Sequence, residues 1–337
     1  MKELRVALIG YGGIARTHNL AYRELKRMGY PVSLVAVCDK NIEQFKTKIR
    51  INLGNDDETL DEGVHTYTDV DDLLKNEEFD IADICLPSFL HKEYSVKMLS
   101  AGKSVLCEKP MALNAADCEE MVSCANRVGK HLMIAQCVRF TTAYLYLKKC
   151  VTERTFGKPR FAMLHRLIKY PAWGSWFASL EKCGGCIIDS HIHDLDVCRY
   201  VFGDPTAVNA VSFDDIPHCQ RVNTHLIYPD LSVVINGAWD DTCATSFECG
   251  YHIKFDEASV IYDGKQITVY PKEGESYVAS PTPVNEFVEE IRYFCDLVQS
   301  DGAVKNTENA PEDSLKSMIL AETVKQSAIE NGALISF

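Results

Sequence analysis

The sequence has few basic residues for its length. Its 337 residues include 35 lysines and arginines against 48 aspartates and glutamates, which gives a formal net charge of -13. Proteins that bind a nucleic-acid backbone concentrate Lys and Arg on one surface, and no run of basic residues occurs here. We therefore expect no nucleic-acid partner.

Long apolar runs are also missing. No segment has the ~18 uninterrupted apolar residues of a membrane span, and Met1-Lys2-Glu3 leads directly into the short run Leu4 to Ile9 instead of a signal sequence. No Pro-rich or Ser-rich tract and no internal repeat is visible. The 14 cysteines are spread along the chain, several of them inside apolar runs, which favours buried reduced thiols over a disulfide framework. We expect a cytoplasmic protein without membrane contact.

The first 137 residues alternate short apolar runs with amphipathic stretches. The runs are Leu4–Ile9, Ser33–Cys38, Ile81–Leu86, Ser104–Cys107 and Leu132–Ala135. Runs that are apolar on both faces are typical of parallel strands covered by helices. Between the first two runs, apolar residues from Ile14 to Met28 recur at helical spacing. The pattern predicts an α/β domain built from βαβ units over residues 1–137.

The second part of the chain has a different period. From about residue 205, apolar residues alternate with polar ones, most clearly from Phe247 to Phe255, as in an antiparallel sheet with one face in solvent. Turn residues at Tyr228–Leu231 and Asp263–Lys265 predict a meander. Two helices should follow, one from Thr282 and one from about Glu312. Residues 138–337 are therefore predicted to form a second α/β domain with a largely antiparallel sheet.

A glycine-rich turn follows the first apolar run. Gly10, Gly12 and Ala15 match the Gly-x-Gly-x-x-Gly/Ala pattern between a predicted strand and a predicted helix. The first glycine permits a tight turn, the second lets the backbone approach a pyrophosphate, and the third small residue lets the helix pack on the strand. Because the helix N-terminus faces the anion, Gly13 and Ile14 complete a predicted dinucleotide site of the Rossmann type.

A carboxylate ends the next predicted strand. Asp39 follows Cys38, where a carboxylate accepts the ribose hydroxyls of NAD and repels the 2′-phosphate of NADP. Lys40 beside it weakens this discrimination, because a cation tolerates the phosphate. The sequence predicts NAD as the cofactor, with NADP less favoured.

Two further segments carry side chains suited to proton transfer. Glu108 and Lys109 follow an apolar run, at the carboxyl end of a strand, where open α/β sheets bind ligands. Asp189, His193 and Asp196 have the spacing i, i+4, i+7, which puts them on one face of a helix.

Oxidation of a secondary alcohol needs a group that takes the hydroxyl proton while hydride leaves for the nicotinamide. Imidazole has a suitable pKa, and we predict that His193 is this base. Lys109 would stabilise the developing alkoxide charge, and Asp189 would accept a neighbouring substrate hydroxyl. A structural role for this histidine remains an alternative, because most histidines on amphipathic helices are structural.

A zinc site is a second alternative in the same segment. Cys183, Cys186, His191 and His193 have a spacing that zinc ligands can have. No second Cys/His cluster of conventional spacing accompanies them, and two glycines lie inside the loop. We therefore predict no metal.

Taken together and in order, these motifs resemble one family. They are the Gly10 to Ala15 turn, Asp39, Pro87 with His91, the Glu108-Lys109-Pro110 segment, and Gly184-Gly185 followed by Asp189, His193 and Asp196. This ordered set is similar to the glucose-fructose oxidoreductase and inositol dehydrogenase family, also called Gfo/Idh/MocA. The resemblance covers essentially the whole chain.

The resemblance implies an N-terminal Rossmann domain, a C-terminal domain with an open, largely antiparallel sheet, and NAD(P)-dependent redox chemistry on sugars, cyclitols and related polyols. It implies that Lys109 is the active-site lysine, His193 the acid/base and Asp189 its partner, as in inositol dehydrogenase-like members. Pro87, His91 and Glu108 would lie along the nicotinamide. A homodimer or homotetramer assembled through the C-terminal sheet is also implied.

Departures from the family pattern concern the substrate. His191 stands where many members have a small residue, so it could add a polar group near the pocket. Arg139, Trp173 and Trp176 could line a sugar pocket by stacking and hydrogen bonding. Few basic residues mark the proposed pocket, which favours an unphosphorylated substrate.

Three functions remain open at this point. The first is a dehydrogenase of a sugar or cyclitol, with the substrate between the two domains. The second is redox-assisted elimination or glycoside cleavage, in which NAD is reduced and reoxidised within one cycle. The third is an NAD-sensing regulator without turnover, against which the presence of both Lys109 and His193 argues.

Overall fold

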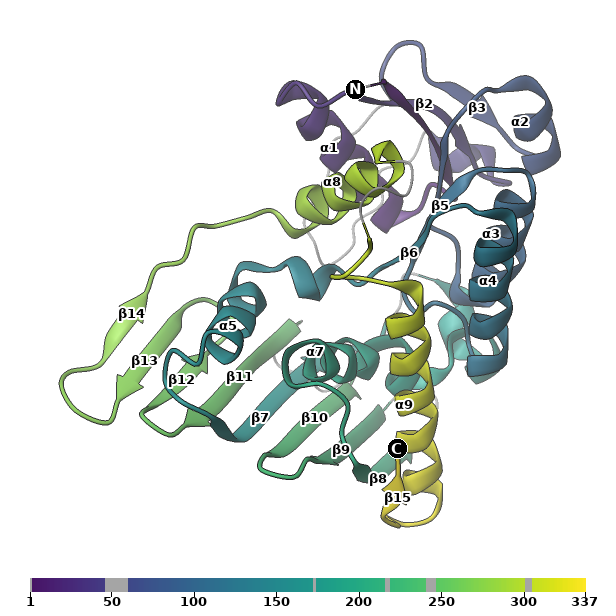
Figure 1. The fold of residues 1–337 in the computed structure, drawn as a ribbon. Coiled ribbons are helices and arrows are strands. Elements are labelled where there is room, and N and C mark those ends of the chain that lie inside the picture. Colours follow the sequence, from purple (N-terminus) through teal and green to yellow (C-terminus); the bar gives the residue numbers. More distant parts are fainter. Residues whose placement is uncertain (1, 46–59, 172–173, 216–218, 241–246, 301–304) are drawn as a thin grey trace. The chain divides into compact units, whose positions relative to one another are not determined.

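The computed structural model describes residues 2–45, 60–171, 174–215, 219–240, 247–300 and 305–337. The chain forms two compact units (Figure 1). The first unit consists of Met1–Cys137 and Asn285–Leu315, and the second of Val138–Val284 and Lys316–Phe337. None of the described helices combines the length and the apolar character needed to cross a membrane.

A parallel six-stranded sheet with the order β3-β2-β1-β4-β5-β6 is the centre of the first unit. Its strands are β1 (Leu4–Ile9), β2 (Val32–Cys38), β3 (His65–Tyr67), β4 (Ile81–Ile84), β5 (Ser104–Glu108) and β6 (Leu132–Ala135). Its main helices are α1 (Gly13–Arg27), α2 (Val70–Asn76), α3 (His91–Ser100), α4 (Ala115–Val128) and α8 (Glu286–Gln299). In Figure 1, α1 and α8 lie on one side of the sheet and α3 and α4 on the other. Every residue of β4, β5 and β6 is buried, which confirms the predicted Rossmann architecture.

Helix α8 belongs to the first unit although it follows the second in sequence. It begins at Glu286 and not at the predicted Thr282, because the Asn285 side chain caps it by accepting hydrogen bonds from two backbone N–H groups. The buried residues of α8 join those of β1 and α1 in one hydrophobic core; they are Phe287, Val288, Ile291, Phe294, Cys295 and Leu297. This packing explains why residues 285–315 depart from the predicted continuous second domain.

A nine-stranded sheet with the order β14-β13-β12-β11-β7-β10-β9-β8-β15 forms the second unit. Its strands are β7 (Pro159–Ile168), β8 (Ala207–Asp215), β9 (Cys219–Ile227), β10 (Ser232–Asp240), β11 (Phe247–Phe255), β12 (Ala258–Tyr262), β13 (Ile267–Pro271), β14 (Tyr277–Ala279) and β15 (Ile335–Ser336). Neighbouring strands are antiparallel except for β10 and β7. The predicted turns join β9 to β10 and β12 to β13, so the sheet is largely antiparallel as predicted.

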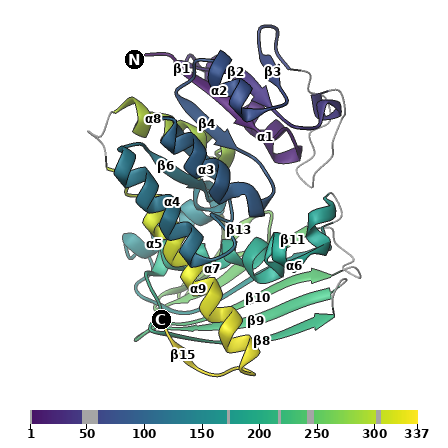
Figure 2. The ribbon, with the colours of Figure 1, turned by 90° about the vertical axis from the view of Figure 1, so that its right-hand side faces the viewer.

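The two faces of this sheet differ. Helices α5 (Thr142–Thr152), α7 (Ile192–Phe202) and most of α9 (Pro311–Ile329) belong to this unit, and α5 and α7 lie over one face (Figures 1 and 2). Strand residues that point to this face are buried, such as Leu164, Ile235 and Ile253. The opposite face exposes large apolar side chains, namely Phe161, Met163, Val211, Phe213, Tyr270 and Val278. We call this set the open face.

Candidate active site

The glycine-rich turn joins β1 to α1 in the first unit. Gly10 has a φ of +89°, and a Cβ there would lie 2.6 Å from the carbonyl oxygen of Cys85, so only glycine fits. A Cβ at Gly12 would have no described atom within 4 Å. Gly12 is also the N-cap of α1 and supplies no side chain to the first backbone N–H groups, while Ala15 is fully buried. Open space beside uncapped N–H groups is what a pyrophosphate requires.

The carboxylate of Asp39 is held beside this turn. Its Oδ2 accepts a hydrogen bond from the backbone N–H of Tyr11 at 2.8 Å, and its Oδ1 accepts one from Asn41 at 2.8 Å. Because β2 and β1 are neighbours, the carboxylate lies where an adenosine ribose binds in this class of fold. The turn and Asp39 together fit a bound dinucleotide.

The Glu108-Lys109-Pro110 segment ends β5. Lys109 is half-buried, and its peptide bond to Pro110 is cis. The Oε2 of Glu108 accepts the backbone N–H of Lys109 at 3.1 Å, and its Oε1 lies 3.1 Å from Nε2 of His18. The buried Glu108 carboxylate therefore uses both oxygens inside the unit, which favours a positioning role. Sequence reasoning missed His18, because its spacing in α1 indicated only an inward-facing position.

Pro87 and His91 lie at the ends of the 3-10 helix that follows β4. The His91 ring is buried, with Nδ1 at 2.7 Å from the carbonyl oxygen of Pro110 and Nε2 at 2.7 Å from that of Leu86. Burial lowers the pKa of His91. The ring ties the loop after β4 to the loop after β5, and this placement favours a bracing role over direct contact with the cofactor.

Asp189 lies in a π-helical turn, Ile187–His191, that leads into α7 in the second unit. Asp189 lies in the π turn, whereas His193 and Asp196 both lie in α7, so the predicted i, i+4, i+7 spacing does not run along a single regular α-helix. His193 is half-buried, whereas every other residue from 191 to 199 is buried. This position suits a residue that contacts a ligand, and π turns are frequent at functional sites.

Asp196 has a different surrounding from the predicted one. Its carboxylate accepts two hydrogen bonds from Arg139, at 2.6 and 2.7 Å, and one from Ser317 Oγ at 2.7 Å. The Arg139 guanidinium also lies over the Tyr200 ring, and Arg139 is only 2% exposed. Asp196 is thus paired with Arg139, which favours a structural role for Arg139 over substrate binding.

His191 and the tryptophans complete the predicted pocket residues. His191 is fully buried, with Nε2 at 2.9 Å from Thr224 Oγ1, and burial lowers the pKa of His191 to about 4. A Cβ at Gly237 would lie 2.5 Å from its ring, so His191 faces the sheet and not a pocket. Trp176 packs against a small hydrophobic core cluster. Trp173 lies outside the described residues.

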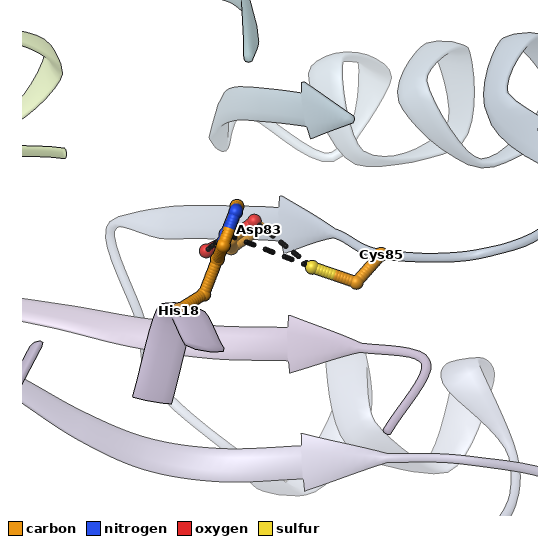
Figure 3. A group of neighbouring side chains, drawn as sticks. All are labelled: His18, Asp83 and Cys85. Atoms are coloured by element: carbon orange, nitrogen blue, oxygen red, sulfur yellow. Dashed lines mark hydrogen bonds and ion pairs between the residues drawn. The ribbon is translucent and has the colours of Figure 1, made fainter. Parts of the chain in front are cut away.

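Two residues of the zinc alternative, Cys183 and Cys186, make hydrogen bonds to other groups. Cys183 Sγ donates to the carbonyl oxygen of Phe177, and the backbone N–H of Cys186 donates to Gln220. Within the described ranges, one group of possible metal ligands lies close together, and it belongs to the first unit: His18, Asp83 and Cys85 (Figure 3). Its distances, 2.9 Å between Nδ1 and Oδ2 and 3.5 Å between Sγ and Oδ1, are those of hydrogen bonds.

Two models of one protein family match the chain, one in each unit. Residues 4–136 match the model of the oxidoreductase family with an NAD-binding Rossmann fold, and residues 144–272 match the GFO/IDH/MocA C-terminal domain. The chain belongs to the Gfo/Idh/MocA family. The resemblance inferred from the ordered motifs is thereby confirmed.

Curated relatives match part of their length. D-glucoside 3-dehydrogenase of Escherichia coli (strain K12) is 31% identical over 217 residues, which are 63% of this chain and 58% of that protein. Inositol 2-dehydrogenase of Pseudomonas syringae pv. syringae (strain B728a) is 29% identical over 202 residues, 60% of this chain and 55% of that protein. The chain thus matches a little over half the length of these relatives.

Solved structures match over the whole chain. The aldose-aldose oxidoreductase from Caulobacter crescentus, complexed with glycerol, has a TM-score of 0.84 at 22% identity and covers both chains completely. Levoglucosan dehydrogenase in complex with NADH has a TM-score of 0.83 at 18% identity, covering 99% of this chain and 98% of the other. These likenesses establish the fold.

Proposed function

We propose that this protein is an NAD-dependent dehydrogenase that transfers a hydride between NAD and a secondary alcohol of an unphosphorylated sugar or cyclitol. The observation that carries the proposal is the turn at Gly10 and Gly12, with its open approach to uncapped N–H groups and the anchored Asp39 carboxylate beside it. Relatives named as glucoside and inositol dehydrogenases support the substrate class.

Each predicted residue has a defined task in this reaction. Backbone N–H groups from Gly12 to Ala15 bind the pyrophosphate, and Asp39 binds the ribose hydroxyls. Bound NAD supplies the hydride acceptor. His193 takes the hydroxyl proton, Lys109 stabilises the developing negative charge on the oxygen, and Asp189 accepts a hydrogen bond from a neighbouring hydroxyl.

The cofactor preference is part of the proposal. The Asp39 carboxylate bonds the ribose hydroxyls of NAD and repels the 2′-phosphate of NADP. Its two backbone hydrogen bonds support this role, because they fix the carboxylate in one orientation. We infer that NAD is preferred and that NADP is used poorly.

A polyol screen tests the reaction. Purified protein with NAD is offered inositols, hexoses, pentoses and their phosphates, and NADH is followed by its absorbance. Multiple turnovers with an unphosphorylated polyol are expected. Redox-assisted elimination would form product without free NADH, and a sensor would bind NAD without any product. Strong activity on sugar phosphates alone would overturn the assigned substrate class.

Two variants test the catalytic residues. Lys109→Ala and His193→Ala should each lower kcat by about 10²- to 10⁴-fold, the usual contribution of a proton-transferring group. NAD affinity, measured by fluorescence titration, should stay nearly unchanged. Wild-type turnover by both variants would contradict the assignment.

The open face supports a proposal about assembly. It presents Val211 at 58% and Phe213 at 62% exposure on a sheet face where no described helix lies. Exposed apolar side chains gathered on one face are typical of protein interfaces, and we infer that a second copy of this chain covers them in a homodimer or homotetramer. A Val211→Asp/Phe213→Ser variant should elute as a monomer in size-exclusion chromatography with light scattering. An unchanged oligomer would exclude this interface.

The free cysteines bear on the cellular location. The cysteines with described side chains are free thiols, and most are buried. Reduced thiols in this number suit a reducing compartment. We propose the cytoplasm.

A further inference from the structure

A chain of buried polar groups leads from the interior of the first unit to Lys109. His18 of α1 is fully buried, with Nδ1 at 2.9 Å from Asp83 Oδ2 and Nε2 at 3.1 Å from Glu108 Oε1. Figure 3 shows how the His18 ring meets Asp83 on the adjacent strand β4. The other oxygen of Glu108 accepts the backbone N–H of Lys109 at 3.1 Å. We call Asp83, His18 and Glu108 the His18 network.

The charge of the network follows from its surroundings. Burial is the largest single effect and opposes a charge on His18, but Asp83 and Cys85 together outweigh it and raise the pKa of His18 well above the usual value. Each ring nitrogen also faces a carboxylate oxygen, and this geometry favours an imidazolium that donates from both nitrogens, one to each carboxylate. Tyr22 donates a further hydrogen bond to Asp83 Oδ2 at 2.9 Å, and Cys85 Sγ lies 3.5 Å from Oδ1.

One more carboxyl group faces the network from α8. Glu290 is fully buried, and neither of its oxygens has a hydrogen-bond partner among the described residues. Burial raises the pKa of Glu290 well above its usual range, and the charge of Glu108 raises it further. Burial thus favours the neutral form of Glu290, and the His18 ring contacts two other carboxylates, those of Asp83 and Glu108.

This arrangement restrains the end of β5. Hydrogen bonds on both ring nitrogens fix the rotation of His18, and contacts on both oxygens fix the Glu108 carboxylate. Burying charges costs free energy that well-packed apolar side chains of the same volume would not cost. The network therefore suits a site where orientation matters more than stability.

We propose that His18 and Asp83 are positioning residues that hold Glu108, and through it the backbone of Lys109, in the orientation that the reaction needs. This inference rests on the proposed function, in which the Lys109 ammonium stabilises the developing alkoxide. A shift of about 1 Å in a group of this kind costs roughly 10²-fold in rate.

The main test uses His18→Gln with Glu290→Gln as its matched control. The amide of the introduced glutamine reaches only one of the two carboxylates, so kcat should fall about 10- to 100-fold, while NAD affinity changes by less than a factor of about two. Glu290→Gln replaces a neutral acid with a neutral amide of the same shape, and its kcat should equal that of wild type. Rates are taken per NADH-binding site, so that a loss of folded protein does not count. An unchanged kcat in His18→Gln overturns the proposal.

A double variant tests whether the effect passes through Lys109. In the Lys109→Ala background the ammonium is gone, and His18→Gln should lower the residual rate by less than a factor of about two, because residues that act as a unit are not additive. A full additional loss in this background would mean that His18 acts elsewhere, and it overturns the proposal.

A second pair of variants, both at Asp83, tests the same proposal if His18→Gln does not fold. Asp83→Asn still offers polar groups to Nδ1 and to Tyr22, so a neutral ring can keep its Nε2–H on Glu108, and kcat should stay within a factor of about three of wild type. Asp83→Leu offers no partner to the ring, and kcat should fall about tenfold or more. Equal kcat values in the two variants overturn the proposal. If Lys109→Ala and His193→Ala both keep wild-type kcat, the proposed function fails; if both lose activity while His18→Gln and Asp83→Leu keep wild-type kcat, the positioning inference alone fails.

Discussion

The two units bury charge in different ways. In the second unit, Arg166 donates to Asp194 at 2.9 and 3.1 Å, and Arg139 pairs in the same bidentate manner with Asp196. Each carboxylate there has its own cation. In the His18 network of the first unit, one imidazolium serves two carboxylates, and one of these also holds the backbone N–H of Lys109.

This difference distinguishes buried charges that stabilise the fold from buried charges that position a residue with a proposed role in catalysis. A matched bidentate pair satisfies its own charges and joins α7 to another segment of the unit, so its loss should be seen in stability. The shared imidazolium ends on a residue with a proposed role in catalysis, so its loss should be seen in the rate.

Asp194→Asn should cause the largest change, because it leaves Arg166 buried without a counterion. The free energy of unfolding of the second unit should fall by about 3–5 kcal/mol, measured by urea denaturation with circular dichroism. The double variant Arg166→Met/Asp194→Leu removes both charges and should recover most of this loss. A loss below about 1 kcal/mol in the single variant would show that the pair is not a structural element.

His191 should make the second unit sensitive to acid. The pKa of its buried ring is lowered to about 4, whereas the unfolded value is near 6.5. The unfolded chain therefore binds the proton more tightly, and stability present above pH 6.5 is lost as the pH falls toward 4. About 1.4 kcal/mol per pKa unit makes this loss roughly 3 kcal/mol. His191→Gln should show a flatter stability profile over this range; an equal slope in both proteins would contradict the assignment.

Glu290 should act in the opposite direction in the first unit. Its pKa is raised in the fold by burial, so the folded state binds the proton more tightly. Stability is present at low pH and is lost as the pH rises above the ordinary value of 4.5. Glu290→Gln should unfold at a higher temperature than wild type near pH 8 and at a similar temperature near pH 5, with about 1.4 kcal/mol for each unit of pKa shift. Equal differences at both pH values would mean that Glu290 is ionised in the fold.

Asp39→Asn should give the smallest change in free energy. The amide oxygen can still accept the N–H of Tyr11, but the negative charge is lost. The ratio of kcat/KM for NAD to kcat/KM for NADP should fall about tenfold, since a hydrogen bond to a charged group contributes about 1.5–3 kcal/mol. An unchanged ratio in steady-state kinetics would remove Asp39 from the basis of the cofactor preference.

Patterns within short segments of the sequence were sufficient to predict individual strands and turns. Strand β1 and the Gly10 turn were predictable because apolar runs and glycines report directly on burial and backbone conformation. Helix α8 was assigned to the wrong unit, since its apolar stripe indicates burial but does not name the surface that buries it.

The site was less predictable where distant segments meet. The pairing of Asp196 with Arg139 was missed because the two residues are 57 positions apart in the sequence, and spacing within one segment does not report contacts between distant segments. The contacts of the His18 network could not be predicted from the sequence, because its members come from α1, β4 and β5, which meet only in the folded unit.

Hydride transfer itself is tested most directly with a deuterated substrate. The polyol that gives the highest rate is prepared with deuterium on its carbinol carbons and incubated with the enzyme and NAD, and the NADH formed is analysed by mass spectrometry. The account predicts free NADH that carries one deuterium, in large excess over the enzyme. Product that forms with its deuterium retained and without free labelled NADH would contradict it.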